Sequence, residues 1–152
     1  MQMIFASLFT LAAAAVASAA PTTRAASCPE AARFGALTVT PTNGLAAGSA
    51  ISGKLDLTCA TQKGIKPEFI DYYLNVPTGN NGYEAPILLK HSTPASGAAS
   101  DSFDTTLPYA TYFDAGYNVY AQLTYPVSGS DGKDYYVTGG VLSPVKITPN
   151  NN

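Results

Sequence analysis

The sequence predicts an all-β protein, built as a two-sheet antiparallel sandwich of about seven strands. Three observations point to this fold class. Apolar and polar residues alternate over most of the chain, turn-forming Gly, Pro and Asn residues recur roughly every 10 to 15 residues, and no segment shows a convincing helical period. The clearest alternation spans residues 114–125, where one face carries Tyr117, Val119, Ala121, Leu123 and Tyr125. A closed β-barrel is the alternative architecture.

The other strands are predicted from the same alternation between turn signals. Residues 85–91 are expected at a sheet edge, because Pro86 has no N–H to donate to a ladder. Asp131-Gly132 predicts a hairpin turn and Gly139-Gly140 a β-bulge, while Cys59 is expected on the core-facing side of its strand. The remaining predicted strands are residues 37–41, 49–59, 68–77, 101–107, 135–138 and 141–147.

The N-terminal residues are read as a targeting segment rather than as part of the fold. An apolar run over residues 3–16 is followed by Ala17-Ser18-Ala19, small residues that suit signal peptidase. We expect a secretory signal peptide; a buried N-terminal helix is the alternative. The predicted organisation is a signal peptide at 1–19, an N-terminal arm at 20–36 with a possible helical turn at 29–33, one β-sandwich at 37–148, and a tail at 149–152.

Charge and composition exclude some classes of partner. The chain has 8 Lys and Arg against 10 Asp and Glu, and no two basic residues are adjacent. A nucleic-acid surface needs clustered positive charge, so we expect no nucleic-acid partner. The tail has no hydrophobic run, so we expect no membrane anchor, and we expect a monomer.

The two cysteines, Cys28 and Cys59, are predicted to form one disulfide in an oxidising compartment. Such a bond closes a loop of about 30 residues and contributes roughly 3 to 4 kcal/mol on the chain-entropy model. A structural zinc site needs four ligands, whereas the chain offers two Cys and the single His91. We therefore expect no metal and no cofactor.

Residues 114–119, Asp-Ala-Gly-Tyr-Asn-Val, resemble the strand that opens with Asp, a small residue and Tyr in immunoglobulin-like domains. This resemblance implies a tyrosine-corner role for Tyr117. The chain has no Trp and no second core Cys opposite Cys59, which argues against an antibody-type domain.

A closer resemblance is to the immunoglobulin-like module at the N-terminus of fungal yeast-cell-wall-synthesis (killer-toxin-resistance) proteins. It is carried by Leu-Thr-Val-Thr-Pro-Thr-Asn-Gly at 37–44, the alternating strand at 51–59, the Gly-Tyr strand at 116–125 and Val-Leu-Ser-Pro-Val-Lys-Ile at 141–147. The resemblance implies an immunoglobulin-like fold and association with a cell wall or the extracellular space. It implies no catalytic residues.

Catalytic chemistry is not indicated by the residues present. The one His, His91, is interpreted as a solvated residue at a strand end, and the chain has no Gly-x-Ser-x-Gly nucleophile motif. Asp131 and Asp134 offer oxygen atoms to calcium, but their spacing matches no calcium loop and a hairpin turn is preferred. Paired acids for glycoside hydrolysis would come from residues interpreted instead as solvated surface acids, namely Asp71, Glu84, Asp101, Asp104 and Asp114.

The chain is rich in tyrosine, with ten residues, and this is the one feature of its composition that indicates a binding function. Flat aromatic faces on a surface of low charge suit stacking against sugar rings or docking to a protein, although Tyr is also a common strand residue. We expect a secreted, non-enzymatic, cell-surface or extracellular binding module that holds cell-wall polysaccharide through Tyr73 and Tyr120. The alternative is a secreted effector that binds a protein through its loops or the edge at 85–91. The tyrosines expected on outward positions or loops are Tyr73, Tyr83, Tyr109, Tyr112, Tyr120 and Tyr135.

Overall fold

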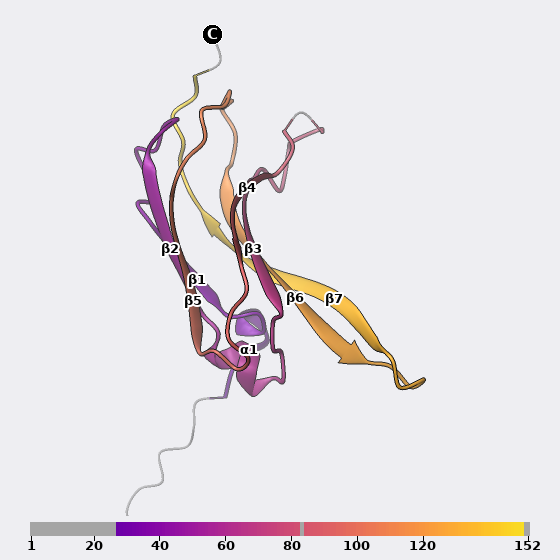
Figure 1. Cartoon of the computed structure of the whole chain (residues 1–152). Helices are drawn as coiled ribbons and strands as arrows, with labels where there is room; N and C mark the ends of the chain where they lie inside the picture. The colour runs from indigo at the N-terminus through magenta and orange to yellow at the C-terminus, as the bar shows by residue number, and fades with distance from the viewer. Residues whose placement is uncertain (1–26, 83, 151–152) are drawn as a thin grey trace, which may run out of the picture.

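The computed structural model describes residues 27–82 and 84–150, so the predicted signal peptide at 1–19 lies outside the described residues. Within these ranges, seven strands form two antiparallel sheets that face each other as an all-β sandwich (Figure 1). The three-stranded sheet has the order β1 (Ala36–Thr40), β2 (Ala50–Asp56), β5 (Ser100–Thr106). The four-stranded sheet has the order β4 (Ile87–Ser92), β3 (Phe69–Asn75), β6 (Asn118–Ser128), β7 (Asp134–Pro144). The predicted fold class is thereby confirmed.

The strand order is that of an immunoglobulin-like sandwich. The fourth strand pairs with the third rather than with the fifth, so the sheets correspond to A-B-E and C′-C-F-G in immunoglobulin notation. β4 lies at a sheet edge and begins immediately after Pro86, as expected from the missing N–H of that residue. None of the helices in the described ranges has the length and hydropathy needed to cross a membrane.

The core lies between the inner faces of the two sheets, and one tyrosine links them. Tyr72 of β3 is fully buried, and its hydroxyl donates to Asp101 Oδ2 of β5 over 2.8 Å. The Ser92 hydroxyl of β4 donates to the other oxygen of the same carboxylate over 3.0 Å. Burial and the Asp101 contact raise the pKa of Tyr72. The apolar part of this core includes Ile51, Leu55, Ile70, Leu74, Phe103, Val119 and Leu123.

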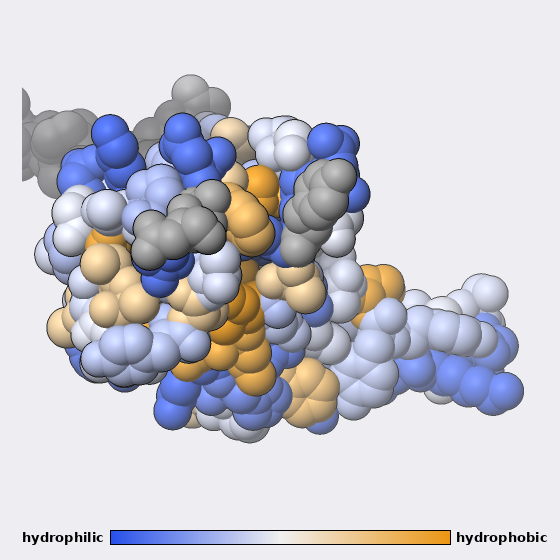
Figure 2. All heavy atoms as spheres, turned by 90° about the horizontal axis from the view of Figure 1, so that it is seen from above, coloured by the Kyte–Doolittle hydropathy of each residue, from blue (hydrophilic) through white to orange (hydrophobic). Residues whose placement is uncertain are grey.

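The β6–β7 hairpin is longer than the rest of its sheet. Pairing of β6 with β3 ends at Phe69 opposite Thr124, whereas pairing of β6 with β7 continues to Ser128 opposite Asp134. The far part of the hairpin therefore projects from the sandwich as a two-stranded ribbon (Figures 1 and 2). The turn contains Gly132 at φ +76°, which agrees with the predicted Asp-Gly hairpin.

Gly139 and Gly140 do not form the predicted bulge, because β7 pairs with β6 without a register shift. The glycines instead make room for two aromatic rings on opposite sides of the sheet. A Cβ at Gly139 would overlap the ring of Phe34, from the N-terminal arm, on the inner side. A Cβ at Gly140 would overlap the ring of Tyr120 on the outer side. Residues 135–147, predicted as two strands, consequently contain one continuous strand that ends at Pro144.

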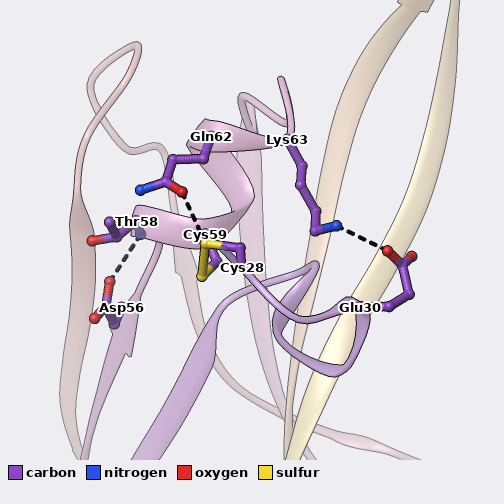
Figure 3. The surroundings of a disulfide bond; sticks show 7 residues. All are labelled: Cys28, Glu30, Asp56, Thr58, Cys59, Gln62 and Lys63. Carbon is purple, nitrogen blue, oxygen red and sulfur yellow. Dashed lines mark hydrogen bonds and ion pairs between the residues drawn. A yellow bond between two sulfur atoms is a disulfide. The ribbon is translucent and has the colours of Figure 1, made fainter. Parts of the chain in front are cut away.

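The end of β2 corrects the prediction for Cys59. The strand stops at Asp56, and α1 (Thr58–Gln62) follows it, so Cys59 lies in a short helix rather than on the inner face of a strand. The Asp56 carboxylate accepts the Thr58 backbone N–H over 2.8 Å, and hydrogen bonding by Thr58 lowers the pKa of Asp56 (Figure 3). Leu57 and Ala60 are both fully buried, three residues apart, which is a helical spacing that the alternation of Leu55, Leu57 and Cys59 conceals.

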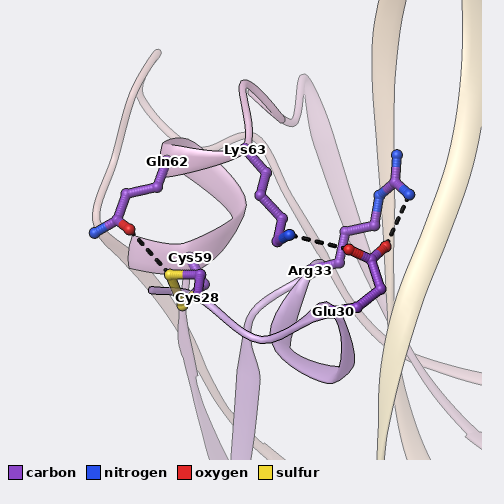
Figure 4. Close-up of polar contacts among 6 residues, drawn as sticks. All are labelled: Cys28, Glu30, Arg33, Cys59, Gln62 and Lys63. Carbon is purple, nitrogen blue, oxygen red and sulfur yellow. Dashed lines mark hydrogen bonds and ion pairs between the residues drawn. A yellow bond between two sulfur atoms is a disulfide. The ribbon is translucent and has the colours of Figure 1, made fainter. Parts of the chain in front are cut away.

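The predicted disulfide joins Cys28 to Cys59, with the two Cα atoms 5.4 Å apart. It ties the N-terminal arm to α1. Gln62 Oε1 lies 3.0 Å from Cys28 Sγ, and because a disulfide sulfur carries no hydrogen this is a close contact rather than a hydrogen bond. Next to it, Glu30 of the 3₁₀ helix η1 (Glu30–Ala32) accepts Lys63 over 3.0 Å and Arg33 over 2.9 Å (Figure 4). The predicted helical turn in this arm is therefore present.

Tyr117 occupies the predicted tyrosine-corner position. Its hydroxyl accepts the backbone N–H of Phe113, four residues upstream, over 3.0 Å and donates to the Glu84 carboxylate. Burial is the main cause that raises the pKa of Tyr117, and the hydrogen bond to Glu84 raises it further. Tyr112, expected on a surface loop, is instead fully buried and contacts Tyr117 edge to face, with ring centroids 5.7 Å apart. Tyr112 therefore belongs to the hydrophobic core although it lies in a loop.

Candidate functional site

The outward side chains of the four-stranded sheet form the surface that we call the aromatic face. Burial of Ile70, Tyr72 and Leu74 on the inner side of β3 directs the residues between them outward. Tyr73 lies directly opposite Tyr120 of β6 in the ladder. The aromatic face comprises Phe69, Asp71, Tyr73, Asn75, Leu88, His91, Asn118, Tyr120, Gln122, Thr124, Tyr136 and Leu142.

Tyr73 and Tyr120, the two residues predicted to bind a ligand, line one hollow of about 330 Å³. The other lining residues are Asn75, Gln122 and Pro86. None of the five carries a charge. A hollow of this size is at the lower end of the range for small-ligand sites. The structure therefore brings the two predicted residues together; whether they bind a ligand stays a prediction.

Two polar groups in the hollow are prepared for hydrogen bonding. The side-chain oxygen of Asn75 is buried and has no hydrogen-bond partner. An unpaired buried acceptor is costly, and each such group in a native structure calls for an explanation. The Tyr120 hydroxyl can both donate and accept a hydrogen bond, and burial raises its pKa. The Tyr120 ring lies so close to Gly140 that a Cβ there would overlap it.

Asn75, Gln122 and Pro86 were not predicted. The signal for Asn75 and Gln122 was present, because each lies two residues from a predicted tyrosine and so has the same outward phase. Pro86 carries no such signal. It precedes β4, and only the antiparallel pairing of β4 with β3 brings it to the rim of the hollow.

His91 lies one residue before the end of β4 and is about half exposed, close to the predicted strand-end position. The sequence did not indicate its partner: His91 Nδ1 is 2.6 Å from Asp71 Oδ1 across the β3–β4 ladder. Phe69 lies beside the imidazole, with ring centroids 5.8 Å apart. In the described part of the chain, no Ser or Cys side chain hydrogen-bonds to His91, so these contacts form no nucleophilic triad.

The candidate acids are distributed over several elements. Asp71 pairs with His91, Asp101 accepts Tyr72 and Ser92, and Asp104 is exposed on the three-stranded sheet. Glu84 and Asp114 share a second hollow of about 340 Å³ at the end of the sandwich, with Val76 and Phe113 among its lining residues. Figure 2 views this end and shows hydrophobic residues between more hydrophilic loops. The Glu84 carboxylate there already accepts the Tyr117 hydroxyl.

The acidic residues considered for calcium are engaged in the hairpin turn. Asp131 accepts the Lys133 backbone N–H over 3.1 Å and the Tyr135 hydroxyl over 2.8 Å. Asp134 accepts the Ser128 hydroxyl over 2.7 Å. Across residues 27–82 and 84–150, no group of three or more His, Cys, Asp or Glu residues is placed to hold a metal ion.

Two further predicted surface tyrosines of the described chain, Tyr109 and Tyr135, lie away from the aromatic face. Tyr109 is 89% exposed in the loop between β5 and β6. Tyr135 is exposed on the ribbon, on the side opposite to Tyr136. Tyr83 lies outside the described residues. These positions leave Tyr73 and Tyr120 as the neighbouring pair among the predicted tyrosines of the described chain.

The fold and this surface define an all-β sandwich whose four-stranded sheet carries aromatic and amide side chains on its outer side. No family model, curated protein or solved structure matches the chain. Function must therefore be inferred from the side chains and their arrangement.

Proposed function

We propose that this protein is a secreted, non-catalytic binding module that holds a neutral polysaccharide of the cell surface or cell wall against the aromatic face. The observation that carries the proposal is the hollow in which Tyr73 and Tyr120 lie as cross-strand neighbours with Asn75 and Gln122. Aromatic rings offer flat apolar surface to the faces of sugar rings, while amide and phenol groups exchange hydrogen bonds with sugar hydroxyls.

The absence of charge in the hollow supports a neutral ligand. A sugar acid or phosphate would be desolvated there without a cation to compensate it, at a large cost. A neutral sugar hydroxyl, in contrast, can exchange hydrogen bonds with the Tyr120 hydroxyl and the Gln122 amide that line the hollow.

Three features support an extracellular location. The predicted signal peptide at residues 1–19 would export the chain, and the Cys28–Cys59 disulfide is of the kind that persists in oxidising compartments. The resemblance of residues 37–147 to the immunoglobulin-like module of fungal cell-wall-synthesis proteins supports a place at a fungal wall.

The proposal is tested by retention on insoluble β-glucan, chitin and cellulose. Wild-type protein should be retained by at least one of them, and Tyr73→Ala with Tyr120→Ala should lower retention by at least tenfold, since truncating a central aromatic costs more than about 1 kcal/mol. Tyr109→Ala is the matched control, because it removes an exposed tyrosine away from the aromatic face and should retain full binding. Loss of binding only in the control, or no retention of the wild type, would refute the proposal.

A second candidate function is binding of a protein target, and exposed apolar residues favour it. Leu88 on the edge strand β4 is 52% exposed, and Val127, Tyr135 and Val137 are exposed on the ribbon. An open strand edge can pair with an extended segment of another chain. Proximity labelling with wild-type protein and with Leu88→Lys distinguishes the two functions. A protein target that depends on Leu88 favours this second candidate, and labelling that Leu88→Lys does not alter excludes the β4 edge.

A further inference from the structure

A second aromatic cluster lies on the same face, farther along β3. Phe69 stacks against Tyr136 of β7, with ring centroids 6.3 Å apart and planes 24° apart. The imidazole of His91 flanks Phe69 on the other side, at 5.8 Å. Tyr136 is 58% exposed, and its hydroxyl donates to Glu68 over 2.7 Å, so the ring is both accessible and held in place.

A third hollow, of about 320 Å³, lies beside this cluster. Its lining includes Glu68, which accepts the Tyr136 hydroxyl, and Pro126, which is the cross-strand partner of Tyr136. Thr93 and Pro94, which follow β4, form part of its wall. The Phe69–Tyr136 cluster therefore adjoins a hollow whose own lining is not aromatic.

The distance between the two aromatic groups suits a chain rather than a single sugar. Tyr73 and Phe69 are four residues apart on β3, which corresponds to about 13 Å. Between them lies a polar row, formed by His91, Asp71 and Gln122 on adjacent strands. Sugar units that cross this row would meet hydrogen-bonding groups, and those at the two ends would meet aromatic rings.

We infer that the ligand is an extended, linear chain of neutral sugars that runs along β3 and contacts Tyr73 and Tyr120 at one end and Phe69 and Tyr136 at the other. This inference rests on the proposed function and adds a second subsite to it. A monosaccharide or disaccharide reaches one aromatic group only, whereas a longer chain reaches both. Affinity should consequently increase with chain length until the ligand spans the two groups.

The test is calorimetric titration with gluco-, cello- and chito-oligosaccharides from disaccharide to hexasaccharide. For wild-type protein, the hexasaccharide should bind at least tenfold more tightly than the disaccharide of the same series. Tyr136→Ala should abolish this gain and leave disaccharide affinity unchanged, because the disaccharide is held at Tyr73 and Tyr120. Tyr136→Phe keeps the ring and should retain the gain.

Tyr135→Ala is the matched control, since Tyr135 is the adjacent tyrosine and faces the opposite side of the ribbon. It should bind every oligosaccharide as the wild type does. Equal affinity for all chain lengths, or a wild-type gain in Tyr136→Ala, would overturn the second subsite while leaving the first intact. Failure of every oligosaccharide to bind would instead remove the proposed function, and the inference with it.

Discussion

The outer faces of the two sheets differ in side-chain type, although their inner faces contribute to one core. The outer face of the three-stranded sheet carries small polar and charged residues such as Thr38, Lys54 and Ser102, and no aromatic residue among its ladder positions. The outer face of the four-stranded sheet carries Tyr73, Tyr120 and the Phe69 cluster. Strand propensity favours aromatic residues in both sheets alike, so it does not explain their collection on one of them. The difference therefore supports a role for the aromatic face in binding.

The largest effects are expected from the inner faces, where the two sheets should behave alike. Leu55 of β2 and Leu123 of β6 are both fully buried. Replacing either with Ala should lower the free energy of unfolding by about 2 to 5 kcal/mol, because each change leaves a cavity in the shared core. Urea denaturation followed by circular dichroism measures this. A negligible loss for one of the two would show that its sheet does not share the core.

An intermediate effect is expected where the sheets are joined through Tyr72 and Asp101. Tyr72→Phe should cost about 1 to 3 kcal/mol at neutral pH, because the partly buried carboxylate loses a donor. Tyr109→Phe, at an exposed position, should retain wild-type stability.

The same contact predicts a dependence on alkaline pH. The pKa of folded Tyr72 is raised by burial and by Asp101, whereas unfolded tyrosine ionises at about pH 10. The stabilisation from this group is therefore complete below about pH 10 and is lost as the pH rises above it. Tyr72→Phe should lose less stability than the wild type between about pH 9 and about pH 11. If the wild type and Tyr72→Phe lost equal stability over this pH range, ionisation of Tyr72 would not be the cause of the loss.

The smallest effects are expected on the polar outer face. Thr38→Ala and Lys54→Ala should each change the free energy of unfolding by no more than about 0.5 kcal/mol, because both residues are exposed. They should also leave polysaccharide retention unchanged. A loss of retention in either variant would indicate that the polysaccharide binds to the three-stranded sheet, and would contradict the assignment of binding to the aromatic face.

Alternation of apolar and polar residues was sufficient to predict the sandwich and the outward phase of Tyr73 and Tyr120, and the missing N–H of Pro86 predicted the edge position of β4. It could not place α1, because a helix of five residues is too short to show a period and Leu57 continues the strand pattern. It could not show that Tyr112 is buried, because alternation assigns a side chain to the inner or outer side only when the residue lies in a strand.

Strand register limited the prediction of the site. Tyr73 and Tyr120 are 47 positions apart in the chain, and their pairing depends on the β3–β6 register, which long-range contacts determine. The contact between Asp71 and His91 depends likewise on the β3–β4 ladder, which contains an irregularity between Tyr72 and Tyr73.

Gly139 and Gly140 of β7 allow aromatic rings to approach the strand closely from both sides of the sheet. At Gly139 and Gly140 only the thickness of a bare peptide backbone separates the Phe34 ring from the Tyr120 ring. The disulfide at Cys28 anchors the segment that carries Phe34. The anchored arm thus supports β7 from the inner side next to the position where the Tyr120 ring covers the strand from the outer side.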